Sequence, residues 1–167
     1  MCRFLAILLL LFCSYGLADN FSADASYQVC FTPGGNCTAK IVEAIGAAKE
    51  QVLVQAFSFT SKNIAYALVR AKQRGIEVKI LFDKSIIDND FLLNYIKRNH
   101  VWFKIDDLPV IAHNKVIIID ERTVITGSFN FTIAAEKDNA ENVLIINDDK
   151  LAQKYAKNWY KRANDSK

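Results

Sequence analysis

Histidine is scarce in this chain of 167 residues, which contains two histidines and four cysteines. Neither histidine lies near a cysteine in the sequence, so a zinc site with both cysteine and histidine ligands is disfavoured. The sequence also has no linker, no low-complexity tract and no long internal repeat. Its composition is 51% hydrophobic and 23% charged, which is typical of a globular protein and not of a disordered one. We therefore expect one folded domain with a sizeable core.

The first eighteen residues, MCRFLAILLLLFCSYGLA, differ from the rest of the chain. One early positive charge, Arg3, precedes an apolar stretch, and Gly16 and Ala18 occupy the −3 and −1 positions of a cleavage site. This pattern predicts a secretory signal peptide over residues 1–18, cleaved after Ala18, and a single catalytic domain over residues 19–167. The predicted localisation is therefore export, either to the periplasm or out of the cell.

Two other interpretations of the same segment are weaker. An uncut membrane anchor would need a longer apolar run, and the polar stretch DNFSADAS follows this one at once. A lipoprotein signal ending at Cys13 is disfavoured by the bulky Phe12 before it. Removal of the leader takes away one charge, Arg3, and leaves 20 Lys and Arg against 18 Asp and Glu. This mild excess permits contact with phosphate but does not by itself indicate nucleic-acid binding.

Cys30 and Cys37 are the two cysteines that remain after the leader. The stretch FTPGGN separates them, and Pro33, Gly34 and Gly35 can bend it tightly enough for a disulfide. A disulfide agrees with an oxidising compartment, whereas two free thiols would indicate a reducing one.

Helical spacing of apolar residues alternates with strand-like runs along the chain. We expect helices over residues 38–50, 60–75, 88–99 and 148–163. We expect strands over residues 51–59, 76–83, 101–106, 111–120, 123–129 and 141–147. The alternation in the first half implies right-handed crossovers. The predicted fold class is α/β, with a mixed, mainly parallel sheet flanked by helices on both faces.

Polar residues fall at the ends of the strands predicted in the second half. His113 and Lys115 stand two apart in HNKVIIID, so they share one face of a strand. Asp120 is an odd number of positions from His113, so an unbroken strand turns it to the other face and gives it a supporting role. Ser128 and Asn130 again share a face in GSFN.

Glu141 opens the next predicted strand and adds a carboxylate to the same edge of the sheet, where open α/β sheets bind ligands. Lys115 and the Asn130 amide could hold an anionic phosphoryl group, and His113 could act as nucleophile or general acid–base. A carboxylate could orient that histidine and stabilise its charged form. Each residue taken singly is more often structural, so the hypothesis depends on their joint spacing.

The stretch HNKVIIID resembles the H-x-K-x4-D motif of the phospholipase D superfamily, and GSFN resembles its G-S-x-N companion. Glu141 stands where that superfamily carries an acidic residue on the following strand, and QAFSF is similar to a strand of its first domain. Most members carry two such motifs in one chain. This chain carries one and resembles the short, single-motif branch, which includes exported bacterial endonucleases and short phospholipase D proteins.

The resemblance implies that His113 attacks the phosphorus of a phosphodiester and forms a phosphohistidine. Lys115 and Asn130 would bind the phosphoryl oxygens, and Glu141 and Ser128 would hydrogen-bond to His113 and orient it. This chemistry is expected to need no cofactor and no metal.

The implied mechanism also needs a second histidine, which protonates the leaving oxygen and then activates water. His100 follows polar residues at a predicted helix end and has no lysine partner, so we expect it on the surface. The second histidine is then His113 of another chain. We therefore expect a symmetric homodimer with a shared active site on or near its two-fold axis.

Three function hypotheses remain open. The first is a non-specific endonuclease on DNA or RNA, because a short chain without a lid or lipid-binding domain suits an exposed groove. Basic residues that could contact a nucleic-acid backbone are Lys62, Arg70, Lys72, Arg74, Lys97 and Arg98. The second is a phospholipase D that releases phospholipid head groups, although no strong amphipathic membrane helix is evident. The third is a non-catalytic nucleic-acid-binding protein, disfavoured because binding needs no nucleophile.

Overall fold

The computed structural model describes residues 18–88 and 90–166. The predicted signal peptide therefore lies outside the described residues except for Ala18. The elements, in chain order, are β1 (Ser26–Thr32), α1 (Cys37–Ala47), β2 (Gln51–Ala56), α2 (Lys62–Gln73), β3 (Glu77–Asp83), the 3₁₀ turn η1 (Lys84–Asp88), α3 (Asp90–Arg98), β4 (Trp102–Asp106), β5 (Lys115–Ile119), β6 (Thr123–Gly127), α4 (Ile133–Lys137), β7 (Glu141–Asn147) and α5 (Asp149–Asp165).

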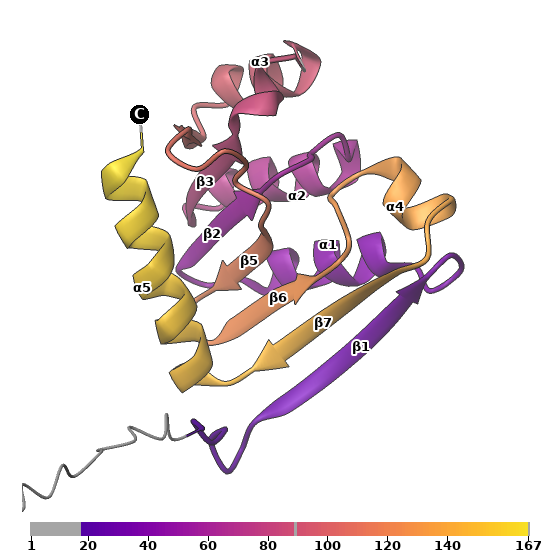
Figure 1. Cartoon of the computed structure of the whole chain (residues 1–167), viewed down its shortest axis with the longest axis vertical. Helices are drawn as coiled ribbons and strands as arrows, with labels where there is room; N and C mark the ends of the chain where they lie inside the picture. The colour runs from indigo at the N-terminus through magenta and orange to yellow at the C-terminus, as the bar shows by residue number, and fades with distance from the viewer. Residues whose placement is uncertain (1–17, 89, 167) are drawn as a thin grey trace, which may run out of the picture.

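The strands form one sheet in the order β1-β7-β6-β5-β2-β3-β4 (Figure 1). The predicted mixed α/β sheet with flanking helices is confirmed, but its parallel part is smaller than expected. Among the described strands, β2–β3 and β3–β4 pair in parallel, and the other four neighbouring pairs are antiparallel. Parallel neighbours need a crossover, and only the segments through α2 and α3 supply one between adjacent strands. A tight turn reverses the chain between β5 and β6, and a longer connection that contains α4 reverses it between β6 and β7.

The core has two parts because side chains alternate along the buried strands. Val52 and Val54 of β2 belong to the larger cluster, which includes Ile41 of α1 and Leu68 of α2. Leu53 faces the opposite side, in a smaller cluster with Ala152, Ala156 and Trp159 of α5. Figure 1 shows α5 on one side of the sheet and α1 and α2 on the other.

Two elements were not predicted from the sequence, the edge strand β1 and the short helix α4. β1 pairs with β7 and places Thr32 opposite Glu141. The Thr32 hydroxyl donates to the carbonyl of Ala135 at 2.7 Å, which attaches α4 to the end of β1. Strand β5 is also shorter than expected, since it begins at Lys115 and leaves His113 in the preceding loop.

The disulfide between Cys30 and Cys37 is present, as predicted, and joins β1 to the first residue of α1. The turn between them requires glycine at position 35. A Cβ atom there would lie 2.1 Å from the carbonyl oxygen of Phe31 and 2.9 Å from Cys30 Sγ. The tight loop is therefore a consequence of Gly35 as well as of the disulfide.

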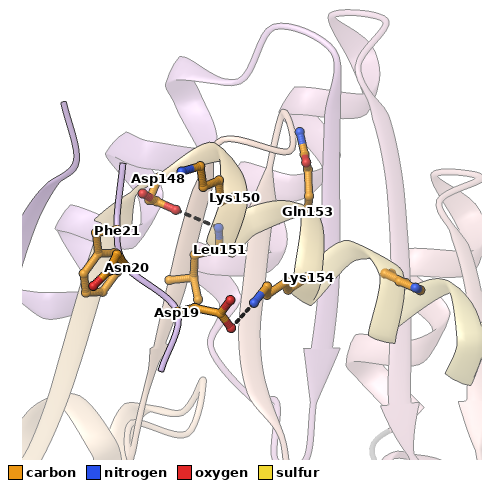
Figure 2. A pocket seen from close by; sticks show the side chains of 9 residues that line it. Asp19, Asn20, Phe21, Asp148, Lys150, Leu151, Gln153 and Lys154 are labelled. Carbon is orange, nitrogen blue, oxygen red and sulfur yellow. Dashed lines mark hydrogen bonds and ion pairs between the residues drawn. The ribbon is translucent and has the colours of Figure 1, made fainter. Parts of the chain in front are cut away.

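Residues 19–21 lie beside the start of α5, where they form one wall of a pocket (Figure 2). The Asp148 carboxylate accepts hydrogen bonds from the N–H groups of Ser22 at 2.6 Å and Leu151 at 2.7 Å. Asp19 forms an ion pair with Lys154. This pocket follows the end of β7 and contains none of the residues predicted to form the active site. Within residues 18–88 and 90–166, no helix is both long and apolar enough to span a bilayer.

Candidate active site

The five residues predicted to carry the chemistry lie at one edge of the sheet. His113 and Lys115 stand at the start of β5, and Ser128 and Asn130 follow β6. Glu141 is the first residue of β7. Because β5 and β6 run antiparallel, and β6 and β7 do too, the start of β5, the end of β6 and the start of β7 meet at this edge.

His113 and Lys115 lie on the same side of the β5 segment, as their spacing predicted. The Lys115 ammonium donates a hydrogen bond of 3.2 Å to the carbonyl of His113. Both side chains contact the ring of Phe57, which directly follows β2. The imidazole and phenyl centroids are 4.4 Å apart, and Lys115 Nζ is 4.9 Å from the phenyl centroid.

Lys115 is unusual for a lysine because its side chain is buried, with 8% of the residue exposed. Burial lowers the pKa of its ammonium group from the ordinary value, and the negative charge of Glu141 opposes this shift. A positive charge held out of water interacts strongly with any anion that reaches it. His113, in contrast, is exposed and accessible to a substrate.

The side chains of Ser128 and Glu141 are joined by a hydrogen bond. The Ser128 hydroxyl donates to the Glu141 carboxylate at 2.5 Å and accepts from the backbone N–H of Asn142 at 3.1 Å. The other carboxylate oxygen accepts from the Asn139 amide at 3.0 Å. Among the described residues, neither Glu141 nor Ser128 forms the expected hydrogen bond with His113; Glu141 accepts from Ser128 and Asn139 instead.

Gly127 makes this arrangement possible. It has a φ of 151°, and a Cβ atom would lie 2.2 Å from the carbonyl oxygen of Asn142. Any other residue would push the end of β6 away from β7 and separate Ser128 from Glu141. The backbones of β6 and β7 therefore approach each other closely at Gly127.

Asn130 lies half-buried in the loop between β6 and α4, next to Phe131. The carbonyl of Phe131 accepts hydrogen bonds from Thr60 at 2.9 Å and Ser61 at 2.8 Å, which attach this loop to the segment after β2. The Asn130 Oδ1 atom is buried and has no hydrogen-bond partner within the described residues. This oxygen is an acceptor, so it is available to a bound group that carries an N–H or O–H donor.

Asp120 lies at the other end of β5, away from the site. Its carboxylate accepts hydrogen bonds from the backbone N–H groups of Lys49 at 2.9 Å, Glu50 at 2.8 Å and Gln51 at 2.9 Å. Five strand residues, each with a rise of about 3.3 Å, separate the two ends of β5. Asp120 therefore joins the turn before β2 to the turn after β5, which is a supporting role, as expected; but β5 ends at Ile119 and Asp120 has a φ of 53°, so its distance along the strand and not strand parity separates it from the site.

His100 also lies away from the site. It is exposed in the turn before β4, with a φ of 52°. β4 runs parallel to β3, and β3 runs parallel to β2, so the start of β4 is at the edge opposite His113. In the part of the chain that the structure describes, no three His, Cys, Asp or Glu side chains are grouped as a metal site would require.

Residues 41–162 match the family model described as the cardiolipin synthase, PLD-like domain. The chain belongs to the phospholipase D superfamily.

Several relatives in the superfamily cover most of this chain. It is 46% identical over 143 residues to the phospholipase D of Rickettsia prowazekii, a match that spans 85% of this chain and 70% of the relative. It is 30% identical over 126 residues to human mitochondrial cardiolipin hydrolase, across 74% of this chain and 50% of that protein. Among solved structures, the phospholipase D family member Nuc from Salmonella typhimurium superposes with a TM-score of 0.82 and 39% identity, over 86% of this chain and 97% of Nuc.

Phospholipase D superfamily membership, together with these relatives, identifies the chain as an enzyme that hydrolyses phosphodiester bonds. The non-catalytic alternative is therefore not supported. Sequence reasoning did not assign a role to Phe57, Asn139 or Asn142. Phe57 stands in the stretch QAFSF, and Asn139 lies two residues before Glu141. Their contacts depend on which strands are neighbours in the sheet, and the sequence does not show this.

Proposed function

We propose that this chain is a metal-independent endonuclease that hydrolyses DNA and RNA without strong sequence preference through a phosphohistidine at His113. The observation that supports this most is an exposed imidazole beside a buried ammonium group, His113 beside Lys115. The likeness to Nuc over 97% of its length favours a nuclease.

In the proposed reaction, the imidazole of His113 attacks the phosphorus of the phosphodiester and the bond to the leaving oxygen breaks. Lys115 and the Asn130 amide bind the phosphoryl oxygens, whose negative charge increases as the new bond forms. Fixed donors of this kind contribute about 10²–10³ each to turnover, because they need no rearrangement during the reaction. The Ser128–Glu141 pair keeps a negative charge near Lys115. Its hydrogen bond also holds the end of β6 beside the start of β7.

The leaving oxygen needs a proton, and the phosphohistidine then needs an activated water. We propose that His113 of a second chain supplies both steps in a homodimer, since His100 lies at the opposite edge of the sheet. Mixing inactive His113→Ala chains with wild-type chains tests this arrangement. Heterodimers are expected to lack normal turnover, whereas full activity of dilute monomers would contradict the shared site.

We further propose that the protein is exported after cleavage of residues 1–18. The leader pattern supports this, and the disulfide between Cys30 and Cys37 is compatible with an oxidising compartment. Sequencing the N-terminus of the protein tagged at its C-terminus is the test. We expect Asp19 as the first residue, and an N-terminus at Met1 would contradict the proposal.

A phospholipid substrate is the alternative, and one observation favours it. Four apolar residues that lie within five positions of His113 or Asn130 in the sequence are more than half exposed: Leu108, Val110, Ile111 and Ile133. Exposed apolar groups next to a site suit an apolar substrate. The names of the Rickettsia and human relatives point the same way.

One pair of assays separates the two substrates. Plasmid nicking and choline release from phosphatidylcholine are measured side by side with a chelator present. The endonuclease proposal predicts nicking that survives the chelator and is lost in His113→Ala. Choline release without nicking would favour the phospholipase instead, and loss of both activities with chelator would contradict the metal-independent mechanism.

A further inference from the structure

Phe57 contacts both side chains that carry the proposed chemistry. Its ring centroid lies 4.4 Å from that of His113, with the two planes tilted by 56°. The Lys115 ammonium lies 4.9 Å from the centre of the same ring. One aromatic side chain is therefore shared by the proposed nucleophile and the proposed phosphate-binding cation.

The backbone holds this ring in a defined place. Phe57 directly follows β2, and its N–H donates a hydrogen bond of 2.8 Å to the carbonyl of Asn114. Asn114 is the residue between His113 and Lys115, so this bond joins the end of β2 to the middle of the His–Lys segment. The Phe57 ring is half-buried, which limits its own movement.

Among the described residues, none forms a hydrogen bond with the His113 imidazole. The Glu141 carboxylate is bonded to Ser128 and Asn139, and not to the imidazole. Within the described ranges, the tilted contact with the ring of Phe57 restricts rotation of the His113 side chain.

We propose that Phe57 is a positioning residue, whose ring orients the His113 imidazole and holds the Lys115 ammonium beside it before substrate binds. The inference rests on the proposed role of His113 as the nucleophile. Aromatic faces attract cations, and aromatic pairs prefer tilted or offset contacts. An aliphatic side chain of similar size fills the same space but offers no flat face and no electrostatic attraction.

Two substitutions separate orientation from space filling. With bis(p-nitrophenyl) phosphate as substrate, we expect Phe57→Leu to lower kcat at least about tenfold and to change KM less than about twofold, because orientation of the reacting group affects the chemical step. Phe57→Tyr keeps the ring and is expected to retain kcat within about threefold. Phe21→Leu is the matched control, since Phe21 is an exposed ring near the start of α5, at the opposite edge of the sheet.

A second measurement is independent of activity. The chain has two histidines, so the imidazole signals in a carbon–proton NMR spectrum can be assigned with His113→Ala, and His100 serves as an internal reference. We expect a nuclear Overhauser contact between the Phe57 and His113 rings in the wild type. A ring-current shift of the His113 signals should persist in Phe57→Tyr and disappear in Phe57→Leu.

Wild-type kcat in Phe57→Leu overturns the proposal, and so does an equal loss in the leucine and tyrosine variants. Absence of the Overhauser contact in the wild-type protein also overturns it, and this result requires no variant to fold. Failure of the proposed function is distinguishable, because His113→Ala would then turn over substrate like the wild type whether or not the two rings touch.

Discussion

Replacing Lys115 by methionine is expected to abolish most activity without lowering stability. The lysine is 8% exposed, and its hydrogen-bond acceptor among the described residues is the carbonyl of His113. Two of its three N–H donors are therefore free for phosphoryl oxygens. A donor of this kind contributes about 3–4 kcal/mol to transition-state binding, so kcat should fall by about 10²–10³.

Stability should change little in the same variant, because methionine is similar in length and removes a buried charge from the core. Burying an ammonium group costs free energy that its few contacts offset only in part. We expect the melting temperature of Lys115→Met to equal or exceed that of the wild type.

The pH dependence gives a further check on Lys115. Its lowered pKa means that, between that value and the ordinary value of 10.5, the unfolded chain binds more protons than the folded chain. The contribution of this group to the free energy of unfolding therefore rises with pH across that alkaline window. Urea unfolding at several alkaline pH values should show this slope in the wild type and not in Lys115→Met.

Lys104→Met is the matched control. The Lys104 ammonium donates to the carbonyls of Ala163 at 3.0 Å and Ser166 at 2.8 Å at the end of α5, away from the site. This variant should lose stability and keep kcat, the opposite of Lys115→Met. The reasoning is refuted if Lys115→Met retains kcat within about threefold. It is also refuted if the loss of activity is no larger than the loss of folded protein in the same sample.

Three other substitutions test how the site edge and its supports are built. Asp120→Ala removes the acceptor of three backbone N–H groups and should lower the free energy of unfolding by about 1–3 kcal/mol, measured in urea, with kcat unchanged. Gly127→Ala introduces a Cβ atom 2.2 Å from the Asn142 carbonyl oxygen and should reduce both stability and kcat, and unchanged kinetics would contradict the close approach. Replacing Cys30 and Cys37 by serine opens a short loop and should cost about 2.5 kcal/mol by thermal unfolding, with no loss expected in a protein that is already reduced.

Most helices and strands of this fold could be predicted, because their apolar residues recur at the period of the element that contains them. β2, β3 and α5 are within a few residues of the expected ranges. β1 could not be predicted, since most of its side chains are exposed and burial alternates only at its end, between Cys30 and Thr32. Its pairing with β7 depends on a partner more than a hundred residues away.

The candidate site, like the fold, has features that the sequence predicts and others that only the structure shows. Local spacing indicated His113, Lys115, Ser128, Asn130 and Glu141, and the length of β5 places Asp120 at the other end of the strand. Those inferences need only the geometry of a strand, which is the same in every protein.

The tertiary structure decided which atoms touch. Among the described residues, Glu141 forms hydrogen bonds with Ser128 and Asn139 and none with His113, at the point where Gly127 brings β6 and β7 close together. Phe57 reaches His113 because β2 is the neighbour of β5 in the sheet. The sequence by itself determined the family and the residue types of the site, since these depend on local order along the chain. Strand order and the depth at which Lys115 is buried depend on contacts between distant segments, and only the folded chain contains them.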